Sequence, residues 1–311
     1  MLRRALLSAF LVAAVAAGPA AASEALSDVN VEGLTLAVNR KGEALLTYKR
    51  ENGTIRRVLV WGAVDSLRPD AVVPQVRFKY DYAGGWGKYR KLYWRTFRSA
   101  CRPYDGPALV YLLASCKAPD GSYWAVQAWV RQLPLLGFAP FLPFHDDVEA
   151  HVSHWSAPLG VLEVSPNWSY GMTAQSLFGR LSYAGAPVHG FGSTRTGNPR
   201  DRYGRNVYID TFDSAYGKGW KRESGILVHR PTGTFCHSFV PQKPFPNYPS
   251  QRMRPAAPGE KYRVTVMGPG VTPLIQWDGP GLTNADKAND PEYNKHFDDM
   301  MAGDKICAPE R

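Results

Sequence analysis

The sequence predicts a mostly β protein, built from antiparallel β-sandwich domains with one short helix near the C-terminus. Aromatic residues make up 12% of the chain, and 29 glycines and 25 prolines divide it, which suits strands joined by tight turns. Apolar and polar residues alternate over short runs between turn signals, as half-buried strands require. A helix start signal, Asp290-Pro291-Glu292, precedes a short periodic run, so we expect a helix there.

The first 22 residues have the pattern of a signal peptide. Arg3 and Arg4 precede an apolar stretch at 5–17, and the small residues at 20–22 predict cleavage after Ala22. We therefore expect a secreted or cell-envelope protein without a transmembrane segment. Loss of two arginines lowers the formal net charge from +10 to +8, so the exported chain stays basic.

The rest of the chain is long enough for two domains. We place the boundary near Gly171, which gives an N-terminal antiparallel β domain at 23–171 and a C-terminal β-sandwich with a docked terminal helix at 172–311. In the first domain, Asn52-Gly53 and Asp120-Gly121 each separate two strand-like runs and predict tight hairpins.

The second domain has strand-like runs at regular short spacing. They lie at 177–183, 206–212, 226–229, 233–239 and 262–267. In the terminal helix, Tyr293, Phe297, Met300 and Met301 share one apolar face, which we expect to pack against the sandwich.

Four cysteines follow the leader, and an exported chain favours disulfides between them. Four cysteines permit three pairings. We prefer Cys101–Cys116, which closes a short loop, and Cys236–Cys307, which ties the terminal helix to a strand of the same domain. No two of them lie close enough in sequence to indicate a zinc site.

Three pieces of the C-terminal part share a pattern: FGRLSYAGAPV at 178–188, RPTGTF at 230–235 and GEKYRV at 259–264. Together they resemble the transthyretin-like, carboxypeptidase-regulatory-like β-sandwich over roughly residues 177–268. Two long loops, at 194–205 and 241–258, depart from it. The resemblance implies a sandwich with a spacer, adhesive or binding role, and it brings no catalytic residue.

The strongest candidate for binding is a basic, aromatic-rich stretch at 77–102, which contains a single acid, Asp81. Aromatic faces stack on sugars, and cations attract carboxylate or sulfate groups. We predict a ligand-binding role for four of its residues: Arg90, Tyr93, Trp94 and Arg95. The alternative is that Tyr89, Leu92, Tyr93 and Phe97 form one buried helical face, with the basic groups solvated opposite.

Three other polar or apolar clusters have structural explanations that we favour. Residues 145–154 are rich in His and acids, but on a strand His151 and His154 point to opposite faces, so we expect an edge strand rather than a metal site. The apolar run at 133–144 fits burial between domains. Asp210, Asp213 and Glu223, with Tyr208 and Tyr216, fit turns and strand edges better than a glycosidase site.

No nucleophile elbow, metalloprotease motif, phosphate loop, dinucleotide fingerprint or calcium loop occurs in the sequence. The leading hypothesis is therefore a non-catalytic exported module that binds glycan or another acidic partner, with no cofactor and no nucleic acid. One alternative is a polysaccharide lyase or hydrolase that uses a His/Tyr/carboxylate site, with His151 or His189 as the histidine. Another is a purely structural extracellular protein.

Overall fold

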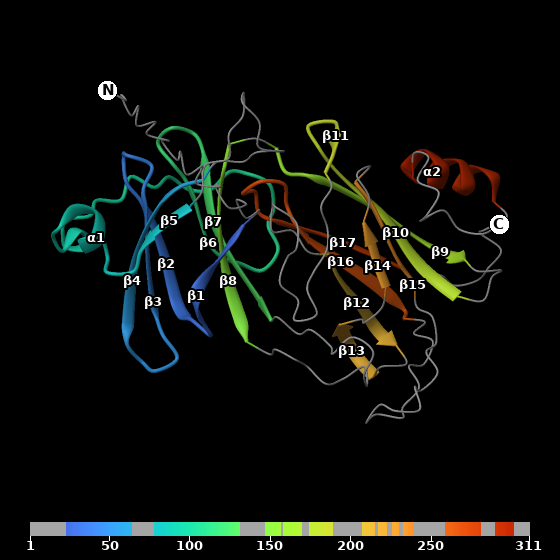
Figure 1. Cartoon of the computed structure of the whole chain (residues 1–311), viewed down its shortest axis with the longest axis horizontal. Coiled ribbons are helices and arrows are strands. Elements are labelled where there is room, and N and C mark those ends of the chain that lie inside the picture. Colours follow the sequence, from blue (N-terminus) through green and yellow to red (C-terminus); the bar gives the residue numbers. More distant parts are fainter. Residues whose placement is uncertain are drawn as a thin grey trace, which may run out of the picture.

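The computed structural model describes residues 23–63, 78–130, 147–156, 158–169, 174–188, 207–214, 217–222, 226–229, 233–238, 259–280 and 290–301. They form two β-sandwiches that lie beside each other along the long axis of the molecule (Figure 1). These sheets are antiparallel, and the longest helix among the described residues lies near the C-terminus, so the predicted fold class is confirmed.

The first sandwich consists of two four-stranded sheets. One has the order β1 (Glu24–Val29), β8 (Val148–Trp155), β7 (Tyr123–Val130) and β6 (Leu112–Lys117). The other has the order β2 (Glu32–Val38), β3 (Ala44–Lys49), β4 (Ile55–Gly62) and β5 (Phe78–Asp81). Alternate residues of both sheets point inward and form one buried core, which includes Leu46, Val58 and Trp124.

Both predicted hairpin turns of this sandwich are present. The N–H of Gly53 donates to the carbonyl of Arg50 at 2.8 Å, and the N–H of Gly121 donates to the carbonyl of Ala118 at 3.0 Å. Each glycine has a positive φ, 81° and 93°, which residues with a Cβ adopt only under strain. The turn residues therefore fix the register of β3 on β4 and of β6 on β7.

The second sandwich packs a five-stranded sheet on a four-stranded one. In the first, β9 (Val161–Ser169) pairs with β10 (Ala174–Tyr183), beside β11 (Ala186–Pro187), β15 (Thr234–Ser238) and β14 (Ile226–His229). The second has the order β13 (Gly217–Arg222), β12 (Val207–Ser214), β16 (Lys261–Met267) and β17 (Leu274–Pro280). Leu177, Phe235 and Val264 are among the residues of the core between them.

The chain passes from one sandwich to the other before the boundary predicted near Gly171. Strand β9 pairs along its length with β10, from Val161 opposite Ser182 to Ser169 opposite Ala174. The change of sandwich therefore falls between the end of β8 at Trp155 and the start of β9 at Val161. The predicted division into two independent domains stays a prediction.

Helix α2 (Pro291–Met301) covers the outer face of the five-stranded sheet (Figure 1). The carboxylate of Asp290 accepts hydrogen bonds from the N–H groups of Glu292 and Tyr293, as the predicted cap requires. The predicted apolar face is also present, because Phe297, Met300 and Met301 are buried against Phe178 and Cys236.

The two sandwiches share a packed junction. Trp129 of β7 contacts a small cluster from the second sandwich that contains Tyr208, Met267 and Leu274. The side chain of Gln127 accepts a 3.0 Å hydrogen bond from the N–H of Leu274 and donates one of 2.8 Å to the carbonyl of Val110. In addition, Val271, from the loop between β16 and β17, is buried in the core of the first sandwich. These contacts join the two cores into one packed body.

Candidate binding face

The four residues predicted to bind a ligand lie in one short segment at the outer end of the first sandwich. Residues 82–100, which we call the cap, follow β5 and contain the single-turn helix α1 (Trp86–Tyr89) and the 3-10 turn η1 (Tyr93–Arg95). Figure 1 shows α1 on the side of the first sandwich that faces away from the second. The cap is therefore remote from the junction between the sandwiches.

Two glycines allow the cap to fold back on itself. Gly84 and Gly85 both have positive φ, 64° and 97°. A Cβ at Gly84 would lie 2.8 Å from the Trp94 ring, and one at Gly85 would lie 2.5 Å from the Cβ of Tyr93. The N–H of Trp94 also donates to the carbonyl of Gly84 at 3.1 Å. Only residues without side chains let the η1 turn approach this closely.

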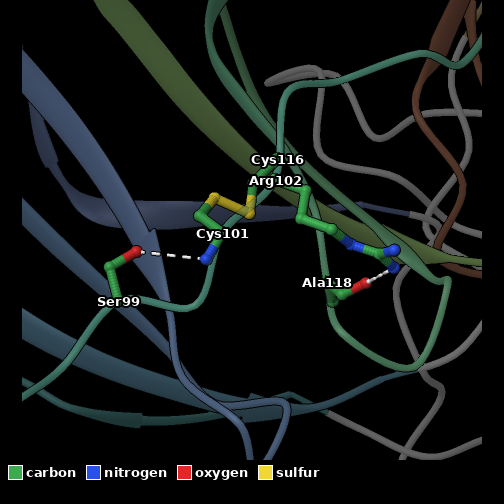
Figure 2. Close-up of a disulfide and its surroundings, with 5 residues drawn as sticks. All are labelled: Ser99, Cys101, Arg102, Cys116 and Ala118. Atoms are coloured by element: carbon green, nitrogen blue, oxygen red, sulfur yellow. Dashed lines mark hydrogen bonds between the residues drawn. A yellow bond between two sulfur atoms is a disulfide. The ribbon is translucent and has the colours of Figure 1, made fainter.

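The C-terminal end of the cap is fixed to both sheets. The N–H of Ala100 donates to the carbonyl of Val38 in β2 at 2.7 Å. The next residue, Cys101, forms the predicted disulfide with Cys116 of β6, and the guanidinium of Arg102 donates to the carbonyl of Ala118 (Figure 2). Because β5 and β6 belong to opposite sheets, the cap spans the end of the sandwich.

The second predicted disulfide is only partly within the described residues. Cys236 is disulfide-bonded and lies under α2. Cys307 lies outside the described residues, so the Cys236–Cys307 pairing stays a prediction.

A buried carboxylate holds the inner side of the cap. Glu43, which is 4% exposed, precedes β3 and accepts hydrogen bonds from the ammonium of Lys88 at 2.6 Å and the hydroxyl of Tyr89 at 2.5 Å. The amide of Asn39 donates to it at 2.7 Å, and the hydroxyl of Tyr93 lies 3.4 Å away. One acid from the sheet therefore ties together both turns of the cap.

The pKa of Glu43 reflects two opposing effects. Burial raises it, but the hydrogen bonds from Lys88, Tyr89 and Asn39 together lower the pKa below its ordinary value. Burial and the bond to Glu43 raise the pKa of Tyr89 well above the usual range for tyrosine. At neutral pH the carboxylate is therefore charged and the phenol keeps its proton, as this hydrogen bond requires.

The only acid of the predicted basic stretch is also buried under the cap. Asp81, at the end of β5, accepts hydrogen bonds from the N–H of Ala83 at 2.9 Å and the N–H of Lys88 at 3.0 Å. Gly87 lies over it, where an added Cβ would come 3.0 Å from the carboxylate. Both carboxylates near the cap are thus used in its construction and face away from solvent.

The outer side of the cap is cationic. Residues 82–100 include five cations and no acid, and only Lys88 is paired with a carboxylate, that of Glu43. The other four are exposed and form no ion pair with any residue that the structure describes: Arg90, Lys91, Arg95 and Arg98. Their charges are available to a partner.

Aromatic rings lie among these cations. Trp86 is 50% exposed, although it is large and apolar. Trp94 is half-buried, with the guanidinium of Arg57 4.0 Å and that of Arg95 5.2 Å from its ring centre. The ammonium of Lys88 lies 4.1 Å from the ring centre of Trp61. The attraction of a ring face for a cation helps to hold these charges in place.

The predicted residues thus divide between two roles. Arg90 and Arg95 are exposed and Trp94 is half-buried, whereas the hydroxyl of Tyr93 points inward to Asn39, 3.2 Å away. The alternative prediction, that four residues of this stretch form one buried helical face, agrees with the structure only in part. The rings of Tyr89, Tyr93 and Phe97 do pack together, with centroids 4.2 and 5.8 Å apart, but Leu92 is 42% exposed.

Two features of the cap were not predicted: Trp86 is its most exposed ring, and Glu43 is the carboxylate that organises it. No local signal marked the exposure of Trp86, since the neighbouring Gly84 and Gly85 make room for Trp94 and Tyr93 instead. The role of Glu43 could not be predicted locally, because its partners in the cap lie 45–50 residues further along the chain.

The histidine-rich run folds as the interior of a sheet, so the expected edge strand is wrong. β8 lies between β1 and β7, and both histidines are buried. The ring of His154 stacks on Trp124 and its Nε2 lies 2.8 Å from the hydroxyl of Ser122. His151 stacks on Trp129, on the opposite face. No group of three or more potential metal ligands occurs among the described residues, and His145 lies outside them.

Two of the acids considered for a glycosidase site, Asp210 and Asp213, interact with residues close by in the second sandwich. Asp210 forms an ion pair with Arg222, and the guanidinium of Arg222 lies 4.7 Å from the ring centre of Tyr208. Asp213 accepts a hydrogen bond from the N–H of Gly219. The other residues considered for a site, Glu223, Tyr216 and His189, lie outside the described parts of the chain. The same is true of the apolar run at 133–144.

No protein-family model, curated protein or solved structure matches this chain. The candidate face is therefore assigned from its own geometry. No helix among the described residues is long and apolar enough to cross a membrane.

Proposed function

We propose that the chain is an exported, non-catalytic binding module, and that the outer side of the cap binds an acidic glycan of the cell envelope or extracellular space. One observation carries the proposal. Four exposed cations have no carboxylate partner within the described parts of the chain, while Glu43 and Asp81, the two acids that contact the cap, are buried beneath them. A folded surface that sequesters its acids and exposes its cations favours an anionic partner.

The aromatic side chains favour a sugar polymer as that partner. An exposed indole such as Trp86 offers a flat apolar face on which a sugar ring can stack, and neighbouring arginines can pair with uronate or sulfate groups in bidentate fashion. Exposed charges contribute modestly one by one, so we expect affinity to come from several contacts along a polymer and to fall with salt.

Heparin and polygalacturonate binding, with neutral dextran for comparison, tests this proposal. The double variant Arg90→Ser/Arg95→Ser removes two exposed charges, and we expect it to bind both polyanions roughly 2- to 30-fold more weakly at low salt. It should also reduce the dependence of log Kd on log salt concentration, because fewer counterions are released. Trp86→Ala should weaken binding without changing that dependence.

A matched control removes the same charge elsewhere. Lys218→Ser/Lys261→Ser takes two exposed cations from the four-stranded sheet of the second sandwich, far from the cap. If both double variants lost the same amount of polyanion affinity, net charge alone would attract the polymer. The proposal would be rejected if, at low salt, heparin and polygalacturonate bound the wild-type chain no more strongly than neutral dextran does.

The two alternative functions stay predictions. A polysaccharide-acting enzyme would need His151 or His189 beside a tyrosine and a carboxylate. His151 does lie 3.3 Å from the carboxylate of Glu149, and its neighbour Trp129 contacts Tyr208, but His151 and Tyr208 are both buried. Turnover that disappears in His151→Ala would favour the enzyme. A chain that binds no polyanion and turns over no polysaccharide would fit a purely structural protein.

The resemblance of residues 177–268 to the transthyretin-like sandwich is compatible with a binding or adhesive module and belongs to the same proposal. The β10–β11 hairpin it anticipated is present, with Ala184 and Gly185 in the turn at positive φ. A hairpin of this kind occurs in many sandwiches, so the ancestry is a prediction separate from the role of the cap.

A further inference from the structure

Another arginine without a carboxylate partner lies beside the cap, outside the stretch that the sequence singled out. Arg57 belongs to β4 and is half-buried. Its guanidinium lies 4.0 Å from the centre of the Trp94 ring, and it forms no ion pair with any residue that the structure describes. Partial removal from water destabilises a cation, and a ring face offsets only part of that loss. The ion pairs of the described residues therefore do not explain where this charge lies.

The side chain of Arg57 points to the outer face of its sheet. Side chains alternate along a strand, and the next residue, Val58, belongs to the core of the first sandwich. Arg57 pairs with Thr47 of β3, which in turn pairs with Thr35 of β2. On its other side, Arg57 forms a bridge with Ala83 in the cap. Two hydroxyls and a guanidinium therefore form a row across the outer face, and the row ends at the cap.

A second guanidinium contacts the same ring. That of Arg95 lies 5.2 Å from the ring centre of Trp94. The guanidinium centres of Arg57 and Arg95 therefore lie within about 9 Å of each other, close to the screening length at physiological salt, so their charges repel. An anionic group bound by both arginines would remove this repulsion, because it supplies the negative charge that neither arginine finds among the described residues.

The ring that both arginines contact is held in place by the protein itself. The N–H of Trp94 donates to the carbonyl of Gly84 at 3.1 Å, and the hydroxyl of the neighbouring Tyr93 lies 3.2 Å from the amide of Asn39. A guanidinium that rests on a fixed ring loses little freedom when it binds, and its five N–H donors lie in one plane. Arg57 is therefore arranged for a planar partner with two acceptor oxygens.

We propose that Arg57, Arg95 and Trp94 form the acid-binding subsite of this face, and that the subsite takes the carboxylate of a uronate residue. The inference rests on the function proposed above and names the sugar that the site selects. A carboxylate is planar and accepts two parallel hydrogen bonds from one guanidinium, whereas a sulfate is tetrahedral and is attached to its sugar through an additional oxygen. Thr47 lies one strand away from Arg57, about 5 Å, so its hydroxyl can bind a hydroxyl of the same sugar.

Arg57→Lys separates the shape of the guanidinium from its charge. The variant is titrated with polygalacturonate, whose only anionic groups are carboxylates, and with dextran sulfate, whose only anionic groups are sulfates. We expect polygalacturonate to bind about 5- to 50-fold more weakly, because lysine has no planar fork, and dextran sulfate to lose less than about threefold, because the charge is kept. A similar loss on both polymers, or no loss on polygalacturonate, overturns the proposal.

The matched control is Arg56→Lys on the same strand. Arg56 is also half-buried, and its guanidinium lies 5.6 Å from the ring centre of Tyr82. Unlike Arg57, it pairs with a carboxylate, that of Asp28 at 3.6 Å, and it points to the opposite face of the sheet. We expect this variant to keep both affinities. If it lost as much polygalacturonate affinity as Arg57→Lys, the loss would come from the sheet as a whole and the subsite would be rejected.

A second measurement uses the wild-type chain. Phenylglyoxal modifies accessible guanidiniums, and peptide mass spectrometry gives the rate at each arginine. With trigalacturonate at ten times its Kd, about a tenth of the sites are empty, so Arg57 and Arg95 should react about tenfold more slowly, whereas Arg56 should keep its rate. Equal rates at Arg57 with and without trigalacturonate overturn the proposal, even where Arg57→Lys loses affinity because the cap has moved.

Failure of the subsite and failure of the proposed function give different results. A wild-type chain that binds no polyanion rejects the function and the subsite together. The other case is a chain that binds polygalacturonate and loses affinity in Arg90→Ser/Arg95→Ser, while its Arg57 is neither protected by trigalacturonate nor sensitive to lysine substitution. In that case the function stands and only the subsite is wrong.

Discussion

The carboxylate of Glu43 accepts a 2.5 Å hydrogen bond from the hydroxyl of Tyr89, two residues that are 46 positions apart. Glu43 belongs to the hairpin that opens β3, and Tyr89 ends α1. Because the same carboxylate also binds the ammonium of Lys88, the rigid sheet determines where the single-turn helix lies. A helix of one turn has little stability of its own, so this external contact is needed to order it.

Glu43→Gln should loosen the cap without unfolding the sandwich. The amide keeps the shape of the carboxylate but removes its charge, and it brings a donor against the amide of Asn39. We expect a loss of about 1–3 kcal/mol in the free energy of unfolding. Trypsin should also cut faster after Arg90 and Lys91, as limited proteolysis followed by mass spectrometry would show.

The matched control for that variant is Glu32→Gln. Glu32 also pairs with a lysine, Lys49, but both side chains are well exposed, so its loss should cost less than about 1 kcal/mol. Similar losses in the two variants would mean that burial gives Glu43 no special role.

Acid should release the cap for the same reason. The folded-state pKa of Glu43 is lower than its ordinary value of 4.5, so the proton binds the unfolded chain more readily than the folded one. The stabilisation is therefore complete above about pH 4.5 and is lost as the pH falls through the lower folded pKa. Trypsin is inactive there, so pepsin cleavage within 82–100 is the measurement. In Glu43→Gln the cleavage rate should show less dependence on pH.

Removal of the Cys101–Cys116 bond should destabilise the first sandwich and free one end of the cap. The cysteines are 15 residues apart, for which loop-closure entropy predicts about 3 kcal/mol. In a Cys236→Ala/Cys307→Ala background only this bond can form. Chemical denaturation with and without reductant then gives its contribution, and equal midpoints would contradict the expectation.

Gln127→Leu should uncouple the unfolding of the two sandwiches. The change leaves the N–H of Leu274 without its acceptor and the carbonyl of Val110 without its donor, at a cost of about 2–4 kcal/mol. Calorimetry should show one transition for the wild type and two for the variant. Gln276→Leu is the control, because Gln276 is only half-buried and bonds to the exposed Asp278. A single transition in Gln127→Leu would show that apolar packing alone couples the sandwiches.

The sequence predicted best those elements that local chemistry determines. The turns at Gly53 and Gly121 and the helix cap at Asp290 lie where the pattern placed them, because each depends on residues within a few positions. Strand β17 was not predicted, since Asp278, Gly279 and Pro280 are poor strand formers. It exists because it pairs with β16 along its whole length, where Arg263 meets Asp278.

The residue types of the candidate face could be predicted from the sequence, but their arrangement on a surface could not. The cations and rings of the stretch are visible in the sequence, whereas their division into inner and outer sides depends on Glu43, more than 40 residues earlier. The edge-strand expectation for β8 was wrong for a similar reason. Strand β1, which covers its open side, begins at Glu24 and was not predicted.

Gly85→Ala should displace the η1 turn. Gly53→Ala serves as the comparison that separates backbone strain from the clash of the added Cβ. Gly85 and Gly53 both have positive φ, 97° and 81°, so alanine at either position costs about 1 kcal/mol in backbone strain. At Gly53 an added Cβ meets nothing within 4 Å, whereas at Gly85 it would lie 2.5 Å from the Cβ of Tyr93. We therefore expect Gly53→Ala to lower stability by about 1 kcal/mol and leave polyanion binding unchanged. Gly85→Ala should cost more and weaken binding, because Tyr93, Trp94 and Arg95 must move together. Equal effects of the two substitutions on heparin affinity would show that the packing of the η1 turn does not shape the binding face.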